Sequence, residues 1–149
     1  MKNKMKVYRS RIDSNFIVSI FYQEHEFYNT IKLEFSKYGI AILDILRNVI
    51  AIDGEAIKSL TRDHIYFIEA HEIAHSKLNH SYPLNAKDET AADFGALILC
   101  KHAQLLNAYN IGIDEFYNRN HVNVKTYSKL YGHNILKQLK LGSALLELI

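Results

Sequence analysis

The sequence of 149 residues contains one cysteine, one proline and six glycines. A single cysteine excludes an internal disulfide, so a packed core has to hold the fold. The scarcity of proline and glycine leaves no stretch with the composition of a flexible linker. No repeat or low-complexity segment is present either. The chain is therefore expected to form one domain over residues 1–149.

The sequence also lacks a strong excess of charge and a long apolar run. Its formal net charge is +2, which gives no electrostatic basis for binding nucleic acid. No apolar run approaches the roughly 20 residues of a membrane-spanning helix, and Phe16–Phe21 is too short for a secretion signal. These observations predict a cytoplasmic protein without nucleic-acid or membrane partners, and they leave its oligomeric state open.

The most informative segment is His71-Glu72-Ile73-Ala74-His75, which has the pattern H-E-x-x-H. One turn of α-helix is about 3.6 residues, so the two histidines project from the same face. Imidazoles at this spacing can each give one nitrogen to a single Zn²⁺ ion, while Glu72 stands beside them without binding the metal. Zinc is therefore the expected cofactor, with His71 and His75 as ligands.

A catalytic zinc needs a third protein ligand, and Glu89 is the candidate that follows His75. Glu89 and Asp93 are separated by one turn of an expected second helix and share a face. Glu89 is expected to bind the metal, and Asp93 to accept an N–H from a ligand histidine. In the alternative interpretation, both are solvated carboxylates at the start of an ordinary helix, where the dipole favours acids.

These residues resemble a known class of enzyme. H-E-x-x-H followed by Glu89-x-x-Ala92-Asp93 resembles the gluzincin metallopeptidases, and the Ala-Asp ending is similar to that of the membrane CaaX-type proteases. The short chain without a membrane span looks more like the ImmA/IrrE family, which includes regulatory proteases of phages and mobile elements. The resemblance covers about residues 40–105. It implies a zincin-like fold and cleavage of a protein substrate, such as a repressor.

The expected ligand set also predicts the reaction. Two imidazoles and one carboxylate on zinc lower the pKa of bound water from 15.7 toward roughly 7. Glu72 can take a proton from that water and return it to the leaving amine, which makes the chain a zinc-dependent endopeptidase. The alternative is a zincin scaffold that binds without turnover. The presence of Glu72 favours the enzyme, because a structural zinc needs four ligands and no base.

Further residues are candidates for the surroundings of the site. His80 is interpreted as a histidine at a helix C-terminus, where the dipole favours it, and His64 can line the cleft. The strand predicted at Val49–Asp53 is a candidate edge to which an extended peptide adds. A donor for the oxyanion is also expected, and the sequence offers five candidates: Tyr82, His121, Tyr127, Tyr131 and His133.

Hydrophobic patterns predict strands in the first third of the chain and helices after it. In this first part we expect a frayed tail at 1–6, a strand at 15–21, a helix at 23–38 ending at Gly39, and strands at 40–46 and 49–53. A turn can join the last two strands as a hairpin, although one helix across 41–50 fits the same run.

The two helices that carry the metal ligands are expected at about 62–79 and from about 88 to 99. Two or three further helices follow residue 114, the last at about 133–149, where leucines at helical spacing are typical of a core. The expected fold is α+β: a small mixed or antiparallel sheet packed on the H-E-x-x-H helix, with a helical C-terminal half.

Overall fold

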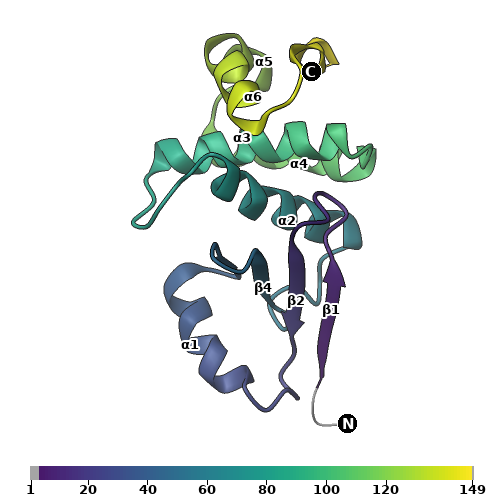
Figure 1. Ribbon diagram of the computed structural model, residues 1–149, viewed down its shortest axis with the longest axis vertical. Coiled ribbons are helices and arrows are strands. Elements are labelled where there is room, and N and C mark those ends of the chain that lie inside the picture. The colour runs from purple at the N-terminus through teal and green to yellow at the C-terminus, as the bar shows by residue number, and fades with distance from the viewer. Residues whose placement is uncertain (1–3, 149) are drawn as a thin grey trace. The chain divides into compact units, whose positions relative to one another are not determined.

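The computed structural model describes residues 4–148 and consists of two compact units, the first ending at Thr61 and the second beginning at Arg62. Within the described residues, all strands belong to the first unit, whereas the second is built from helices (Figure 1). The combination is an α+β protein with a helical C-terminal half, as the sequence predicts. The expectation of a single domain stays a prediction.

The first unit contains a mixed four-stranded sheet. Its strands are β1 (Met5–Arg9), β2 (Ile17–Phe21), β3 (Ala41–Asp44) and β4 (Val49–Asp53), in the order β1-β2-β4-β3. β2 runs parallel to β4, and the two other pairs are antiparallel. Parallel neighbours need a crossover, which here includes α1 (Tyr28–Tyr38) and β3.

The two central strands carry the apolar face of this sheet. Alternate residues of β2 and β4 are buried, and the parallel register places Val18 beside Ile50 and Ile20 beside Ile52. Because side chains alternate between the two faces of a strand, this register gathers four β-branched residues on one face. These apolar side chains fix the pairing of β2 with β4, since a slip by one residue would move them all to the other face.

The structure corrects the predicted role of Val49–Asp53. This segment is β4, which pairs with β2 on one side and with β3 on the other, so it is an interior strand and offers no free edge to a peptide. The buried side chains of Ile50 and Ile52 are typical of a central strand. The β3–β4 hairpin is confirmed, with Asn48 in the left-handed region at its turn (φ 53°), and the alternative helix across 41–50 is wrong.

The N-terminal tail predicted at 1–6 is wrong in its last part, because Met5 and Lys6 lie in β1 and pair with β2. Residues 1–3 lie outside the described residues. Most side chains of β1 are exposed, so the strand is held by backbone hydrogen bonds and leaves little hydrophobic pattern in the sequence. The helix predicted from residue 23 begins only at Tyr28, because turns occupy the preceding residues, where His25 Nδ1 accepts the N–H of Phe27.

The second unit is a group of packed helices. They are α2 (Arg62–Lys77), α3 (Ala86–His102), α4 (Leu106–Asn120), α5 (Val124–Tyr127) and α6 (His133–Leu139), with a π-helical turn at Ser128–Gly132 and a 3₁₀ turn at Ser143–Leu148. α2 packs on α3 and α4, and α3 also packs on α6 (Figure 1). None of the helices in the described part of the chain combines the length and the apolar character needed to cross a bilayer.

The helix predicted at 133–149 is wrong after Leu139, where α6 ends, and residue 149 lies outside the described residues. Lys140 adopts the left-handed conformation (φ 61°), and its N–H binds the carbonyl groups of the last turn, which closes the helix. Gly142 follows and disfavours a new α-helix. The predicted core position is confirmed for Leu136 and Leu139, which are buried.

Gly112 lets α4 approach its neighbours closely. A Cβ atom at this position would lie 2.5 Å from Phe67 Cε1 and 2.6 Å from Leu97 Cδ2, far inside van der Waals contact. We therefore expect Gly112→Ala to lower the free energy of unfolding by about 1–3 kcal/mol, as overpacking does, despite the better helix propensity of alanine. Urea unfolding of the variant and the parent measures this difference.

Gly142 provides the matched control, because a Cβ atom there would meet nothing within 4 Å. Gly142→Ala should change the free energy of unfolding by less than about 0.5 kcal/mol. Equal stability of the Gly112→Ala variant and the parent would contradict the close packing of α4 on Phe67 and Leu97.

The single cysteine, Cys100, lies in the buried middle of α3. Burial, together with the nearby Glu69 carboxylate, raises the pKa of its thiol to about 12. Only the thiolate is nucleophilic, so a disulfide reagent at pH 8 should modify Cys100 at the rate of unfolding. A rate that does not respond to urea would contradict this burial.

The raised pKa of the Cys100 thiol makes the free energy of unfolding depend on pH. The folded state favours the neutral thiol, so this contribution to stability is complete below pH 9 and is lost as the pH rises through 12. Cys100→Ser should remove this alkaline loss, because serine does not titrate in that range. Urea unfolding at pH 8 and pH 10.5 compares the two proteins.

Candidate metal centre

The site is built where α2 meets the first turn of α3. At the start of α3 the Asn85 side chain accepts a hydrogen bond from the backbone N–H of Asp88 at 2.8 Å. In turn, the Asp88 carboxylate accepts one from the backbone N–H of Asn85 at 3.5 Å. This capping box fixes the turn that carries Glu89. The helices pack closely, because a Cβ atom on Gly95 would lie 3.0 Å from the Cβ atom of Ala74. Small residues therefore bring Glu89 to the face of α2 that carries the histidines.

The three predicted ligands converge. His71 Nε2 lies 3.0 Å from His75 Nε2 and 3.4 Å from Glu89 Oε1, and His75 Nε2 lies 2.6 Å from Glu89 Oε1. Bonds of about 2.0–2.1 Å to a tetrahedral zinc would separate two ligand atoms by about 3.3 Å. The three atoms are thus close to the spacing that one small cation requires, and this group could hold a metal ion.

His71 is oriented by a buried carboxylate. Its Nδ1 lies 2.8 Å from Asp93 Oδ1, and Asp93 is only 2% exposed. The Asp93 carboxylate also accepts hydrogen bonds from both Nε and Nη2 of Arg119 and, at 3.0 Å, from Asn120 Nδ2. Although burial opposes ionisation of Asp93, the hydrogen bonds with His71 and Arg119 hold its pKa below the ordinary value. An ionised Asp93 accepts the Nδ1–H of His71, which leaves Nε2 with a lone pair for a metal.

His75 is oriented by a second histidine. Its Nδ1 lies 2.8 Å from His80 Nδ1, and His80 Nε2 lies 3.7 Å from Asp88 Oδ1. Burial, reinforced by the charge of His75, lowers the pKa of His80, so a neutral His80 can accept the Nδ1–H of His75. His80 follows the end of α2, as the sequence predicts. The interpretation of His80 as a histidine favoured by the helix dipole does not predict its contact with the ring of His75.

The electrostatics of the group favour positive charge at its centre. Burial opposes protonation of His71, but its hydrogen bonds with Asp93 and Glu89 outweigh burial and raise its pKa to about 9. The hydrogen bonds of Glu89 with His71 and His75 hold the pKa of Glu89 well below its usual range. A divalent cation at the centre of the group would also supply this positive charge. Two imidazole nitrogens and one carboxylate oxygen form a ligand set that suits zinc.

Glu72 lies beside His71 and His75 on α2 and is 9% exposed. Burial raises the pKa of its carboxyl, and the neighbouring histidines only partly oppose this change. Within residues 4–148 no hydrogen bond or ion pair engages the Glu72 carboxylate. The carboxylate is therefore more basic than an exposed glutamate and has its oxygens available to a ligand.

A cavity of about 430 Å³ borders this group. Its wall includes His71, Glu89 and Asp93, together with Thr90, Arg119 and Asn120. The amide hydrogens of Asn120 are directed at Asp93 and at the Phe116 carbonyl, and the Thr90 hydroxyl faces the Ala86 carbonyl and the Asn120 amide oxygen. Among the side chains of this wall, only the half-exposed Arg119 keeps spare N–H donors after binding Asp93.

Two residues of the site, Arg119 and Asn120, are not predicted by the sequence pattern. They lie 26 and 27 residues after Asp93, at the end of a different helix, and no local spacing pattern links them to the motif. None of the five predicted oxyanion donors, nor His64, lines this cavity. Two of the five, Tyr127 and Tyr131, line a neighbouring groove instead.

Comparison with protein-family models, curated proteins and solved structures found no match for this chain. The fold and the site are therefore the basis for a proposal about function. Together they define an α+β protein in which two helices bring two histidines and a glutamate together beside a buried glutamate, in a group that could hold a metal ion.

Proposed function

We propose that this protein is a zinc-dependent endopeptidase of the gluzincin type, similar to the ImmA/IrrE family. The observation that carries the proposal is the convergence of two imidazole nitrogens and one carboxylate oxygen beside the unengaged, buried carboxylate of Glu72. Three protein ligands leave one position open for water or substrate, whereas a structural zinc site is closed by four. This difference favours catalysis over a purely structural role.

In this proposal His71, His75 and Glu89 hold the ion. When bound, zinc supplies Lewis acidity, which favours ionisation of water and polarises a carbonyl group. Glu72 accepts the proton of the attacking water and delivers it to the leaving amine, and its raised pKa makes it a stronger base for that transfer. Asp93 and His80 keep the two ligand rings oriented.

Arg119 is the residue that we propose to hold the substrate carbonyl oxygen. Its guanidinium lies in the wall of the cavity that His71 and Glu89 also line, and part of its hydrogen-bonding capacity remains available. A fixed N–H donor aimed at a developing negative charge stabilises the transition state. We further propose a cytoplasmic regulatory protein, such as a repressor, as the substrate, which is what the resemblance to the ImmA/IrrE family implies.

The experiment is a peptide-library digestion followed by mass spectrometry. The purified protein should contain about one zinc per chain, lose cleavage after treatment with a chelator, and regain it with one equivalent of zinc. Cleavage that persists in the chelated protein would contradict the proposal. Full zinc content with no cleavage of peptides or of denatured proteins would instead favour the non-catalytic scaffold.

A further inference from the structure

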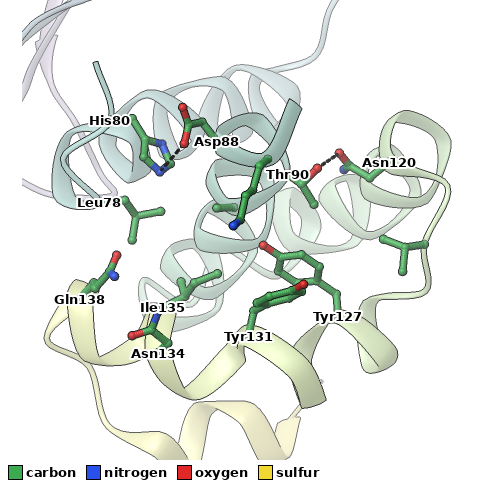
Figure 2. A pocket seen from close by; sticks show the side chains of 13 residues that line it. Leu78, His80, Asp88, Thr90, Asn120, Tyr127, Tyr131, Asn134, Ile135 and Gln138 are labelled. Carbon is green, nitrogen blue, oxygen red and sulfur yellow. Dashed lines mark hydrogen bonds and ion pairs between the residues drawn. The ribbon is translucent and has the colours of Figure 1, made fainter. Parts of the chain in front are cut away.

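A second cavity shares the hydrogen-bonded pair Thr90 and Asn120 with the first. It is a groove of about 460 Å³ between the start of α3 and the segment that runs from α5 to α6. Figure 2 shows Tyr127 and Tyr131 side by side in its wall, with Leu78 and Ile135 nearby. We call this cavity the tyrosine groove.

The tyrosine groove has the chemistry of a site for an apolar side chain. The rings of Tyr127 and Tyr131 lie 4.7 Å apart between centroids at an angle of 41°, which leaves ring faces and edges for an aromatic partner. The side-chain amides of Asn134 and Gln138 line the same groove and offer donors and acceptors to a peptide backbone. The apolar and aromatic part of the wall consists of Leu78, Ala91, Val122, Tyr127, Tyr131 and Ile135, and polar or charged residues such as Lys87 and Asp88 form the rest. The volume of the groove lies within the range of about 300–1,000 Å³ that is typical of ligand sites.

The tyrosine groove adjoins the candidate metal centre, because the two share lining residues and are lined by neighbouring residues of the chain. Thr90 follows the ligand Glu89, and the Thr90–Asn120 pair, joined at 2.8 Å, lines both the groove and the 430 Å³ cavity. His80, which contacts the ligand His75, also lines the groove (Figure 2). A peptide that crosses the Thr90–Asn120 pair would thus place neighbouring residues in the two cavities.

We propose that the tyrosine groove binds an aromatic or large aliphatic side chain of the peptide substrate, next to the bond that is cleaved. This inference rests on the proposed peptidase function and adds to it a substrate class: proteins with such a residue beside the scissile bond. Tyr131 is the specificity-determining residue, because it lines the groove and is 45% exposed as a residue.

The test measures binding without hydrolysis. N-acetyl-phenylalaninamide and N-acetyl-alaninamide are titrated into the protein, and amide NMR shifts are followed. Only the phenylalanine probe should shift the signals of residues in the groove. Tyr131→Ala should weaken its binding by about fivefold or more, the loss expected when a well-packed aromatic contact is removed. Leu130→Ala is the matched control, since Leu130 is 69% exposed on the same turn and does not line the groove.

Equal shifts with both probes, or shifts that Tyr131→Ala leaves unchanged, would overturn the proposal. A second measurement uses peptides that the parent protein cleaves. There Tyr131→Ala should reduce the preference for an aromatic over a small residue beside the scissile bond by about fivefold, with zinc content unchanged. If the parent binds the phenylalanine probe in the groove but cleaves no peptide, the peptidase function fails and the assignment of this ligand as a substrate residue falls with it.

Discussion

Glu72→Gln is expected to reduce peptide hydrolysis by about 100-fold to 10,000-fold, the range for loss of a general base. Glutamine has nearly the same shape, but its amide cannot accept the proton of the attacking water. The substitution leaves the three proposed metal ligands in place, so the expected zinc content remains about one per chain. Cleavage rates and metal analysis on the same preparation measure both quantities.

The fold should survive this substitution because the Glu72 carboxylate has no hydrogen bond or ion pair to lose within the described residues. A neutral amide also avoids the cost of burying a charge. Asp63→Asn is the control: it makes the same exchange of acid for amide in the first turn of the same helix, away from the ligands, and should leave cleavage unchanged. Unreduced cleavage in Glu72→Gln would exclude Glu72 as the base.

Glu89→Ala is expected to weaken zinc binding by about 100-fold or more, because it removes one of the three proposed ligands. Asp93→Asn should weaken it less, by about 10-fold to 100-fold, since it removes an outer hydrogen-bond partner of His71 and leaves the ligands in place. Competition with a chelator of known affinity measures both variants. Lys87→Ala, an exposed change beside the same turn, should bind zinc as the parent does.

The order of these two effects identifies the third ligand. The structure places Glu89 Oε1 within 3.4 Å of both Nε2 atoms, whereas Asp93 faces the opposite nitrogen of His71. Full zinc affinity in Glu89→Ala, combined with loss in Asp93→Asn, would mean that Asp93 binds the metal and that α3 shifts along α2 when zinc is present.

The parts of the site that follow from helical periodicity could be predicted from the sequence. His71, His75 and Glu89 lie within 19 consecutive residues, on two helices whose ends are marked by turn-forming residues, and the structure brings them together. Arg119 could not be predicted in the same way. It reaches Asp93 only because α4 packs on α3, and that packing depends on tertiary contacts such as those at Gly112.

The predictions for two strands of the sheet, β4 and β1, are wrong for a related reason. The sequence predicts β4 at an edge, whereas the structure has it between β2 and β3, because a short apolar run indicates burial but not the number of neighbouring strands. The sequence does not predict β1, because this strand is held by backbone pairing with β2 and most of its side chains are exposed. Hydrophobic pattern therefore predicted which residues are buried better than it predicted which strands are neighbours.

Asp93 joins three helices, since it lies on α3, contacts His71 on α2 and accepts hydrogen bonds from Arg119 and Asn120 at the end of α4. Fraying of the last turn of α4 would remove the groups that hold this carboxylate and so release the ring of His71. If zinc binds as proposed, its escape and the local unfolding of α4 would be one kinetic event. The amides of that turn should exchange their hydrogens more slowly in the zinc-loaded protein, and the lifetime of the bound metal should track their opening rate.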